Sequence, residues 1–443
     1  MTRSQESDSE LPVEETRPDG PAVEAEVLLG QEAAPHDAYL ALRNPNYRSF
    51  ALAFLFSSTS LQMLGTALAW EVYERTQDAL QLGYLGLARA APVILLTLPA
   101  GQAADLWDRK RLLFATQATF ALACTLLAIV SHGNLGLWLT YALLVLTGAA
   151  RSFHGPARNS LMPLLVEAHE FHNAVTWNSG VFQLSAICGP LIAGALIGVT
   201  GAAWPVYATT ACGCGSAAVL ALFLRPRPQV RGDGRFTLAS MTAGAGHLLR
   251  DKTVLAAITL DLFAVLLGGA TALMPVYAKL LAVGPEGLGA LRAAPYVGAF
   301  VMALVLAHRP PFQKAGRALL ASVAGFGAAT IVFGVSQNFV LSLAMLVLLG
   351  ALDNISVVIR HVLVQVRTPD ALRGRVSAVN SVFIECSNEL GAFESGLVAK
   401  IFGPVASVVS GGMGTILVVL GIAWAWPDVL RLGKVAPEKD ASR

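Results

Sequence analysis

Charged residues are scarce in this sequence. Only 14% of the 443 residues are charged, whereas soluble domains carry about 25%. A large soluble protein needs such charges to cover its surface, so the composition excludes an ordinary soluble protein. With 55% hydrophobic residues and a mean hydropathy of +0.59, the chain is typical of a membrane protein with many spans.

Cysteines and several catalytic motifs are also scarce or absent. Five cysteines in 443 residues cannot form a secreted disulfide scaffold. The sequence has no G-x-x-x-x-G-K-[ST] motif, so ATP is not an evident energy source. It also lacks His-Glu-x-x-His and Cys-x-x-Cys spacings, and we therefore expect neither a metal site nor a cofactor.

The first 37 residues differ from the rest in charge. They hold ten acidic residues against Arg3 and Arg17, which makes this tail −8 and the remaining chain +10. The tail is rich in Glu, Pro and Ser and has no apolar period, which predicts a disordered, solvated extension. It has no basic segment followed by an apolar one, so we do not expect a cleaved signal peptide.

Long apolar segments fill most of the remaining sequence. A helix that crosses about 30 Å of hydrocarbon needs about 20 mostly apolar residues. Twelve segments meet this test, near 49–72, 80–103, 112–131, 135–153, 174–198, 203–224, 254–278, 286–307, 317–335, 338–360, 376–400 and 404–426. We predict an all-α integral membrane protein with twelve transmembrane helices in two pseudo-symmetric six-helix bundles. The predicted parts are an acidic tail 1–47, an N-terminal bundle 48–224, a central loop 225–253, a C-terminal bundle 254–427 and a C-terminal tail 428–443.

Lysine and arginine predict the orientation. In the predicted topology, 26 of the 31 basic residues fall on one side, while Arg75, Lys279 and Lys400 fall on the other and Arg89 and Arg292 lie within helices. Basic residues favour the cytosolic side, so we expect both termini in the cytosol and a multi-pass protein of the cell (inner or plasma) membrane. The same rule accounts for the basic loops, and we expect no nucleic-acid partner.

The two halves of the sequence repeat each other. Arg89-Ala-Ala-Pro92 recurs as Arg292-Ala-Ala-Pro295, and Arg158 and Gly189 recur as Arg360 and Gly391 at nearly the same offset. Repeats of six helices related by an axis along the membrane normal place a substrate site near the midplane, between the halves.

The segment after the second predicted helix resembles a conserved loop of the major facilitator superfamily. It has Gly101, then Asp105 after three residues, then a basic cluster that begins at Arg109. The resemblance implies the fold of that superfamily and a gating role for these residues. The sequence departs from the family's pattern at Leu106, where the family usually has arginine, and at Asp108, where it often has glycine.

The same resemblance implies contacts and a direction of transport. Asp105 would lie at the positive N-terminus of the helix that follows Arg373 and Arg375. Gly189-Pro190 in the fifth predicted helix is similar to a Gly-Pro signature of exporters, where small residues allow close packing and proline kinks the helix. The motifs from Asp261 to Gly391 resemble the enterobactin-exporter-like branch of the superfamily, which implies export of a small molecule.

Ionisable residues within the membrane are costly and are functional candidates. Arg89 and Glu394 lie at similar depths, about 9–13 Å from the predicted outer end, on helices that face each other in the resembled fold. We predict an outer ion pair that breaks on outward opening; a permanent structural pair is the alternative. Asp353 and Arg360 share a helix face, which favours a structural pair.

Glu385 and Glu389 are four residues apart and share a helix face. Two carboxylates in a low-dielectric cavity cannot both ionise at low cost, so one of them can carry a proton. Glu389 is the first candidate and Glu385 the second. A structural pairing of Glu385 with cytosolic-side arginines such as Arg360 is the alternative.

The resembled fold places the first, fourth, seventh and tenth helices around a cavity. The substrate-cavity candidates are therefore Gln62, Trp70, Asp261, Tyr277 and Asp353. We predict a monomeric secondary transporter that exports a siderophore-like or drug-like small molecule by alternating access, with protons as the counter-ion and no enzymatic activity. Two alternatives stay open, a transporter-like sensor that does not transport and a membrane-embedded lipid-modifying enzyme.

Overall fold

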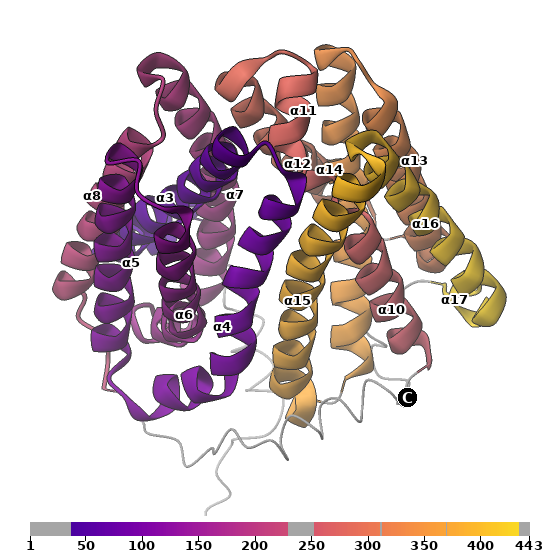
Figure 1. Ribbon diagram of the computed structural model, residues 1–443. Coiled ribbons are helices and arrows are strands. Elements are labelled where there is room, and N and C mark those ends of the chain that lie inside the picture. The colour runs from indigo at the N-terminus through magenta and orange to yellow at the C-terminus, as the bar shows by residue number, and fades with distance from the viewer. Residues whose placement is uncertain (1–36, 229–251, 311, 369, 434–443) are drawn as a thin grey trace, which may run out of the picture. The chain divides into compact units, whose positions relative to one another are not determined.

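The computed structural model describes residues 37–228, 252–310, 312–368 and 370–433. These residues form helices and no strand (Figure 1). The residues from Ala41 onward form one compact unit. Most of the predicted acidic tail, most of the predicted central loop and residues 434–443 lie outside the described residues.

The helices, in chain order, are α2 Leu40–Arg43, α3 Pro45–Thr76, α4 Ala79–Leu106, α5 Arg109–His132, α6 Leu137–Leu161, η1 Met162–Leu164, α7 Phe171–Thr200, α8 Trp204–Phe223, α10 Lys252–Leu267, η2 Gly269–Thr271, α11 Met274–Leu280, α12 Gly284–Ala307, α13 Ala315–Val335, α14 Phe339–Arg367, α15 Asp370–Phe402, α16 Pro404–Ala425 and α17 Pro427–Leu430.

The predicted fold class is confirmed. Each of the twelve apolar segments contains helix, and eleven of them match one continuous helix. Among the described residues, nine helices are long and apolar enough to cross a membrane. The number of twelve spans and the boundaries of the two bundles therefore stay predictions. For clarity, the end of the helices at which α3 begins and α4 ends is called the basic end below, and the other is called the opposite end.

The predicted helix 254–278 is wrong as a continuous helix. The structure has α10 up to Leu267, the short turn η2, and α11 from Met274. Two consecutive glycines, Gly268 and Gly269, are poor helix formers, and Pro275 suits the first turn of a new helix because it has no N–H to donate. The α10 segment has 16 residues, fewer than the about 20 needed to cross a bilayer.

Helix packing defines an N-terminal half, α3 to α8, and a C-terminal half, α10 to α16. Within the first, α3 packs on α7 and α8, α5 on α6 and α8, and α4 on α6. Within the second, α14 packs on α12 and α13, α13 on α16, and α10 on α15. The main contacts between the halves are made where α4 lies beside α15 and α7 beside α12 (Figure 1), and α3 makes smaller contacts with α11 and α12. One cluster of buried apolar residues contains members of both halves, such as Tyr207 and Tyr277.

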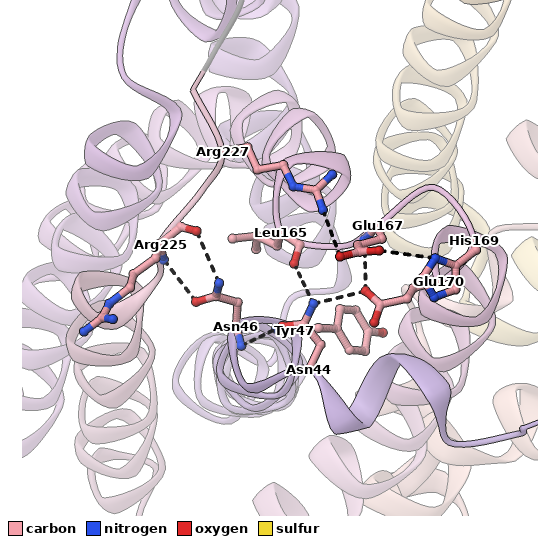
Figure 2. A network of polar contacts seen from close by, with 9 residues as sticks. All are labelled: Asn44, Asn46, Tyr47, Leu165, Glu167, His169, Glu170, Arg225 and Arg227. Carbon is pink, nitrogen blue, oxygen red and sulfur yellow. Dashed lines mark hydrogen bonds and ion pairs between the residues drawn. The ribbon is translucent and has the colours of Figure 1, made fainter.

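A polar network holds the basic end of the N-terminal half together (Figure 2). Asn44 caps α3, since its Oδ1 accepts from the N–H of Asn46 at 3.0 Å, and its Nδ2 donates to the Leu165 carbonyl and to Glu170, each at 3.1 Å. Asn46 exchanges two 3.3 Å hydrogen bonds with the Arg225 backbone. The start of α3 is thereby tied to the α6–α7 connection and to the residues that follow α8.

Candidate functional site

Glycines bring α4 and α15 close together. A Cβ added at Gly86 would lie 3.0 Å from the carbonyl oxygen of Glu389, and one at Gly83 would lie 3.0 Å from the Cα of Phe393. From the other side, a Cβ at Gly396 would lie 2.8 Å from the carbonyl oxygen of Ala79. Each of these distances is shorter than nearly all Cβ contacts in proteins, so a side chain at these positions would require the neighbouring helix to shift.

An ion pair crosses this contact. The Arg89 Nη2 of α4 lies 3.7 Å from the Glu389 Oε2 of α15. The sequence analysis paired Arg89 with Glu394, and the structure corrects the partner: among the described residues, Arg89 pairs with Glu389, while Glu394 accepts a hydrogen bond from Ser395. Glu389 is about one and a half turns farther from the opposite end than Glu394, which matches the depth of Arg89 better. The pair borders a cavity lined by Arg89, Ala90, Val93, Ile94, Arg151, Cys386 and Glu389.

The two arginines of the repeated motif meet near Gly65 of α3. A Cβ added at Gly65 would lie 3.6 Å from the Arg292 Nη2 and 3.9 Å from the Arg89 Nη1. Within the described part of the chain, Arg292 makes no hydrogen bond or ion pair, and the Nε of Arg89 is buried without a partner. Two guanidinium groups therefore lie close together between the halves, and one of them, that of Arg89, pairs with Glu389.

Gly189 and Pro190 of α7 contact two helices, α3 of the same half and α12 of the other half. A Cβ on Gly189 would lie 3.0 Å from the carbonyl oxygen of Thr59 in α3, so this glycine allows close packing within the N-terminal half. The carbonyl oxygen of Pro190 faces the other half, 2.6 Å from a Cβ built on Gly289 of α12. One turn on, a Cβ built on Gly194 would lie 3.0 Å from the Cα of Gly289. The α7–α12 contact therefore also depends on small residues.

Two ion pairs link the halves at the opposite end. Lys400 Nζ of α15 lies 2.7 Å from Asp78 Oδ2, and Lys279 Nζ of α11 lies 2.7 Å from Glu74 Oε2 of α3. The hydrogen bond from Lys400 lowers the pKa of Asp78 below its ordinary value. Sequence reasoning missed both pairs, although the opposite side carries so few basic residues that Lys279 and Lys400 could have been matched to nearby acids.

A second charged cluster lies within the C-terminal half. Arg360 of α14 forms a buried ion pair with Asp261 of α10, and its Nε donates to the Ser356 hydroxyl at 3.3 Å. The sequence analysis paired Arg360 with Asp353, and the structure corrects this partner as well. Asp353 lines a cavity together with Asp261 and Ser356. The predicted alternative for Glu385, a pairing with Arg360, is not tested because the Glu385 side chain is not described.

The other predicted substrate residues are Tyr277, Trp70 and Gln62, and each packs against neighbouring parts of the fold. Tyr277 is 1% exposed, and its hydroxyl donates to the Gly334 carbonyl at 2.9 Å. Trp70 packs against the apolar cluster, and Gln62 of α3 lies against Gly189 of α7. Their role in substrate binding stays a prediction.

The predicted gating loop is described in part. Arg109, at the start of α5, donates to the carbonyls of Ala104 and Ser160, so it joins the ends of α4 and α6. Gly101 lies in α4. The side chains of Asp105, Arg373, Arg375 and Glu385 lie outside the described side chains. The two arginines belong to α15, which begins at Asp370 and therefore earlier than predicted.

No group of three or more His, Cys, Asp and Glu residues that could hold a metal ion occurs among the described residues. The candidate site therefore consists of an interface between the halves with a charged cluster at its middle, and a second charged cluster in the C-terminal half. Such an arrangement can bind and release ions or small molecules, and can change when the halves move.

Comparisons with known proteins extend these observations. The chain is 24% identical over 402 residues to the Enterobactin exporter EntS of Escherichia coli O1:K1 / APEC, covering 90% of this chain and 96% of that protein. The same values hold for Enterobactin exporter EntS of Shigella boydii serotype 18. Among solved structures, a bacterial homolog of the human lysosomal transporter Spinster, inward-facing and unoccupied, is 13% identical with a TM-score of 0.64 and covers 87% of this chain and 96% of its own. The nucleoside transporter NupG is 12% identical with a TM-score of 0.68, covering 86% and 100%.

The family model of the Major Facilitator Superfamily matches residues 50–387, which is most of the chain. This confirms the family predicted from the Gly101–Arg111 segment and does not favour the lipid-modifying enzyme or the sensor. Members of a transporter family are generally not enzymes. The chain belongs to the major facilitator superfamily and is a multi-pass membrane transporter of small molecules.

Proposed function

We propose that this transporter exports a small molecule by alternating access, driven by inward proton flow. The observation that carries the proposal is the Arg89–Glu389 ion pair, which joins α4 of one half to α15 of the other. The relatives named as enterobactin exporters match along 96% of their length, which supports export of a siderophore-like or drug-like molecule. The same relatives support a location in the inner membrane, and we propose that the transporter acts as a monomer.

The conformation supports a closed outer gate. If both termini are cytosolic, as the basic residues predict, the opposite end faces outward. Asp78–Lys400 and Glu74–Lys279 then close the outer side, and the glycine contacts between α4 and α15 lie in the same half of the membrane. Outward opening has to separate these helices and break the Arg89–Glu389 pair.

Glu389 is the proposed proton carrier, with Glu385 as the second candidate. In the outer-closed state, Glu389 pairs with Arg89 and would already have released its proton to the cytosol. A proton taken up from outside would neutralise Glu389 and keep the pair broken while the substrate leaves. Proton and substrate would thus move in opposite directions.

Transport in proteoliposomes tests the proposal. We expect the purified protein to accumulate enterobactin or ethidium against a gradient when a pH difference is imposed, and to lose accumulation when an ionophore collapses it. Absence of pH-driven accumulation of both probes contradicts the proposal. Glu389→Gln should abolish the pH-driven component, whereas Glu394→Gln, whose carboxylate contacts only Ser395 among the described residues, should retain it. Wild-type accumulation by Glu389→Gln removes Glu389 as the carrier.

A further inference from the structure

Asp353 lies in the middle of the 29-residue helix α14. It lines a cavity whose other walls are Asp261 and Ser356 and the apolar residues Ala264, Val265, Val323, Phe326 and Leu352. The one guanidinium beside it, that of Arg360, is already bound to Asp261 and Ser356. Across the described residues, Asp353 makes no hydrogen bond or ion pair.

The charges around this cavity do not cancel. On α14, the neighbouring ionisable groups are Arg360 and the exposed His361, which contacts the Val357 carbonyl. Of the helices packed on α10 and α14, α16 has no charged residue and α13 has only Arg317 near its start. Of the charged residues of α12 and α15 whose side chains are described, Arg292 and Glu389 belong to the cluster with Arg89. Among the described side chains, two carboxylates therefore face the Arg360 guanidinium.

Helix α10, which carries Asp261, ends at Leu267 beside α15, the helix that carries Glu389. The carbonyl oxygens of Val265 and Leu266, in the last turn of α10, lie 2.9 Å and 2.8 Å from a Cβ built on Gly391 of α15. Gly391 is two residues from Glu389. A helix broken at this depth provides a hinge between two shorter segments, so a change at Asp261 acts on the part of α10 that contacts the gating helix.

We infer that Asp353 and Asp261 form a proton-binding site around Arg360, separate from Glu389. The inference rests on the proposed proton-driven transport. Two ionised carboxylates that share one guanidinium at membrane depth are disfavoured, and one proton shared between the two carboxylates removes the excess charge. A proton fits better than a metal cation, because hard cations need six or more oxygen ligands and this cavity offers two carboxylates and one hydroxyl among apolar walls.

Infrared spectroscopy tests the site without any substrate. We expect the wild-type protein in lipid membranes at neutral pH to show absorption from a protonated carboxyl that is missing from Asp353→Asn. Asp261→Asn should remove it too, because Asp353 is then free to pair with Arg360 and stays ionised. Asp428→Asn, an exposed carboxylate in α17, is the matched control and should retain the signal, as should Glu389→Gln.

Three results would overturn the inference. The first is no protonated carboxyl in the wild type, and the second is a signal unchanged in Asp353→Asn or in Asp261→Asn. The third is a signal lost on adding Na⁺ to protein kept in choline, which would mean that a metal cation takes the site.

Transport separates this inference from the proposed function. We expect Asp353→Asn to lower pH-driven accumulation of enterobactin or ethidium at least about tenfold, while counterflow exchange of the same probe changes less than about twofold. Wild-type accumulation by Asp353→Asn overturns the coupling role of the site. If the wild type itself shows no pH-driven accumulation, the proposed function fails, and the infrared result still decides whether the site binds a proton.

Discussion

Arg89 of α4 and Glu389 of α15 face each other at 3.7 Å across the two halves of the transporter. Each charge would be poorly solvated without the other, so we expect Arg89→Glu and Glu389→Arg each to disfavour the closed contact. The cost should be about 1–3 kcal/mol, below that of fully buried pairs, because the Arg89 side chain is 32% exposed. The double variant Arg89→Glu with Glu389→Arg should recover part of the counterflow lost in the single variants. No recovery in a double variant that inserts normally would contradict a pairwise role.

Gly86 is expected to control the spacing of α4 and α15. A methyl group there would lie 3.0 Å from the Glu389 carbonyl oxygen and 3.2 Å from the Ala392 Cβ, so Gly86→Ala must move the helices apart. We expect a larger distance between spin labels on the two halves at the opposite end, and reduced transport. The control is Gly215→Ala in α8, where a Cβ meets nothing within 4 Å; this change should stabilise the helix by up to about 1 kcal/mol. Unchanged distances in Gly86→Ala would contradict the close-packing role.

The Asp78–Lys400 contact predicts a pH-dependent contribution to stability. Because the folded pKa of Asp78 is lowered, the contribution is present above the unfolded pKa of about 3.9 and is lost as the pH falls through the lower folded pKa. Lys400→Gln should therefore reduce the melting temperature at pH 7, and the difference from wild type should shrink below about pH 4. The effect should stay under about 1 kcal/mol, since the two side chains are 25% and 49% exposed. A difference that persists at low pH would show that the ion pair is not its source.

Asn44 should contribute measurably to the stability of the N-terminal half. It caps α3 and also bonds to Leu165 and Glu170 (Figure 2). Asn44→Ala removes the cap at a cost of about 1 kcal/mol and leaves the Leu165 carbonyl without this donor. Asn44→Asp is the matched comparison, because it keeps the cap but places a second carboxylate beside Glu170. Thermal unfolding in detergent should rank wild type first, and equal stability of all three proteins would contradict the network's role.

Composition predicted most helices correctly because each apolar segment is long enough to cross the membrane as a helix. Arg89, Asp261, Glu389 and Arg360 were singled out because ionisable residues stand out in an apolar sequence. Their partners were harder to predict. A shift of five residues separates Glu389 from Glu394, and only the packing of Gly86 against Glu389 decides which carboxylate meets Arg89.

The break between α10 and α11 was missed for a different reason. Hydropathy is high across 254–278, so the apolar pattern continues through Gly268 and Gly269 even though the backbone does not. The pair Glu74–Lys279 was missed because it depends on where α11 lies after that break. Composition predicts whether a segment lies in an apolar environment. The Glu74–Lys279 contact depends instead on where the chain turns between α10 and α11.

The break also allows α11 to contact the other half of the molecule. By chain order, Met274–Leu280 belongs to the C-terminal half, yet it contacts α3, and Lys279 binds Glu74 and lies over the Tyr73 ring. In the same structure α11 also packs on α12 of its own half, so it lies between the two halves. The segment predicted as one helix therefore gives α10 to the packing of the second half and α11 to the contact between the halves.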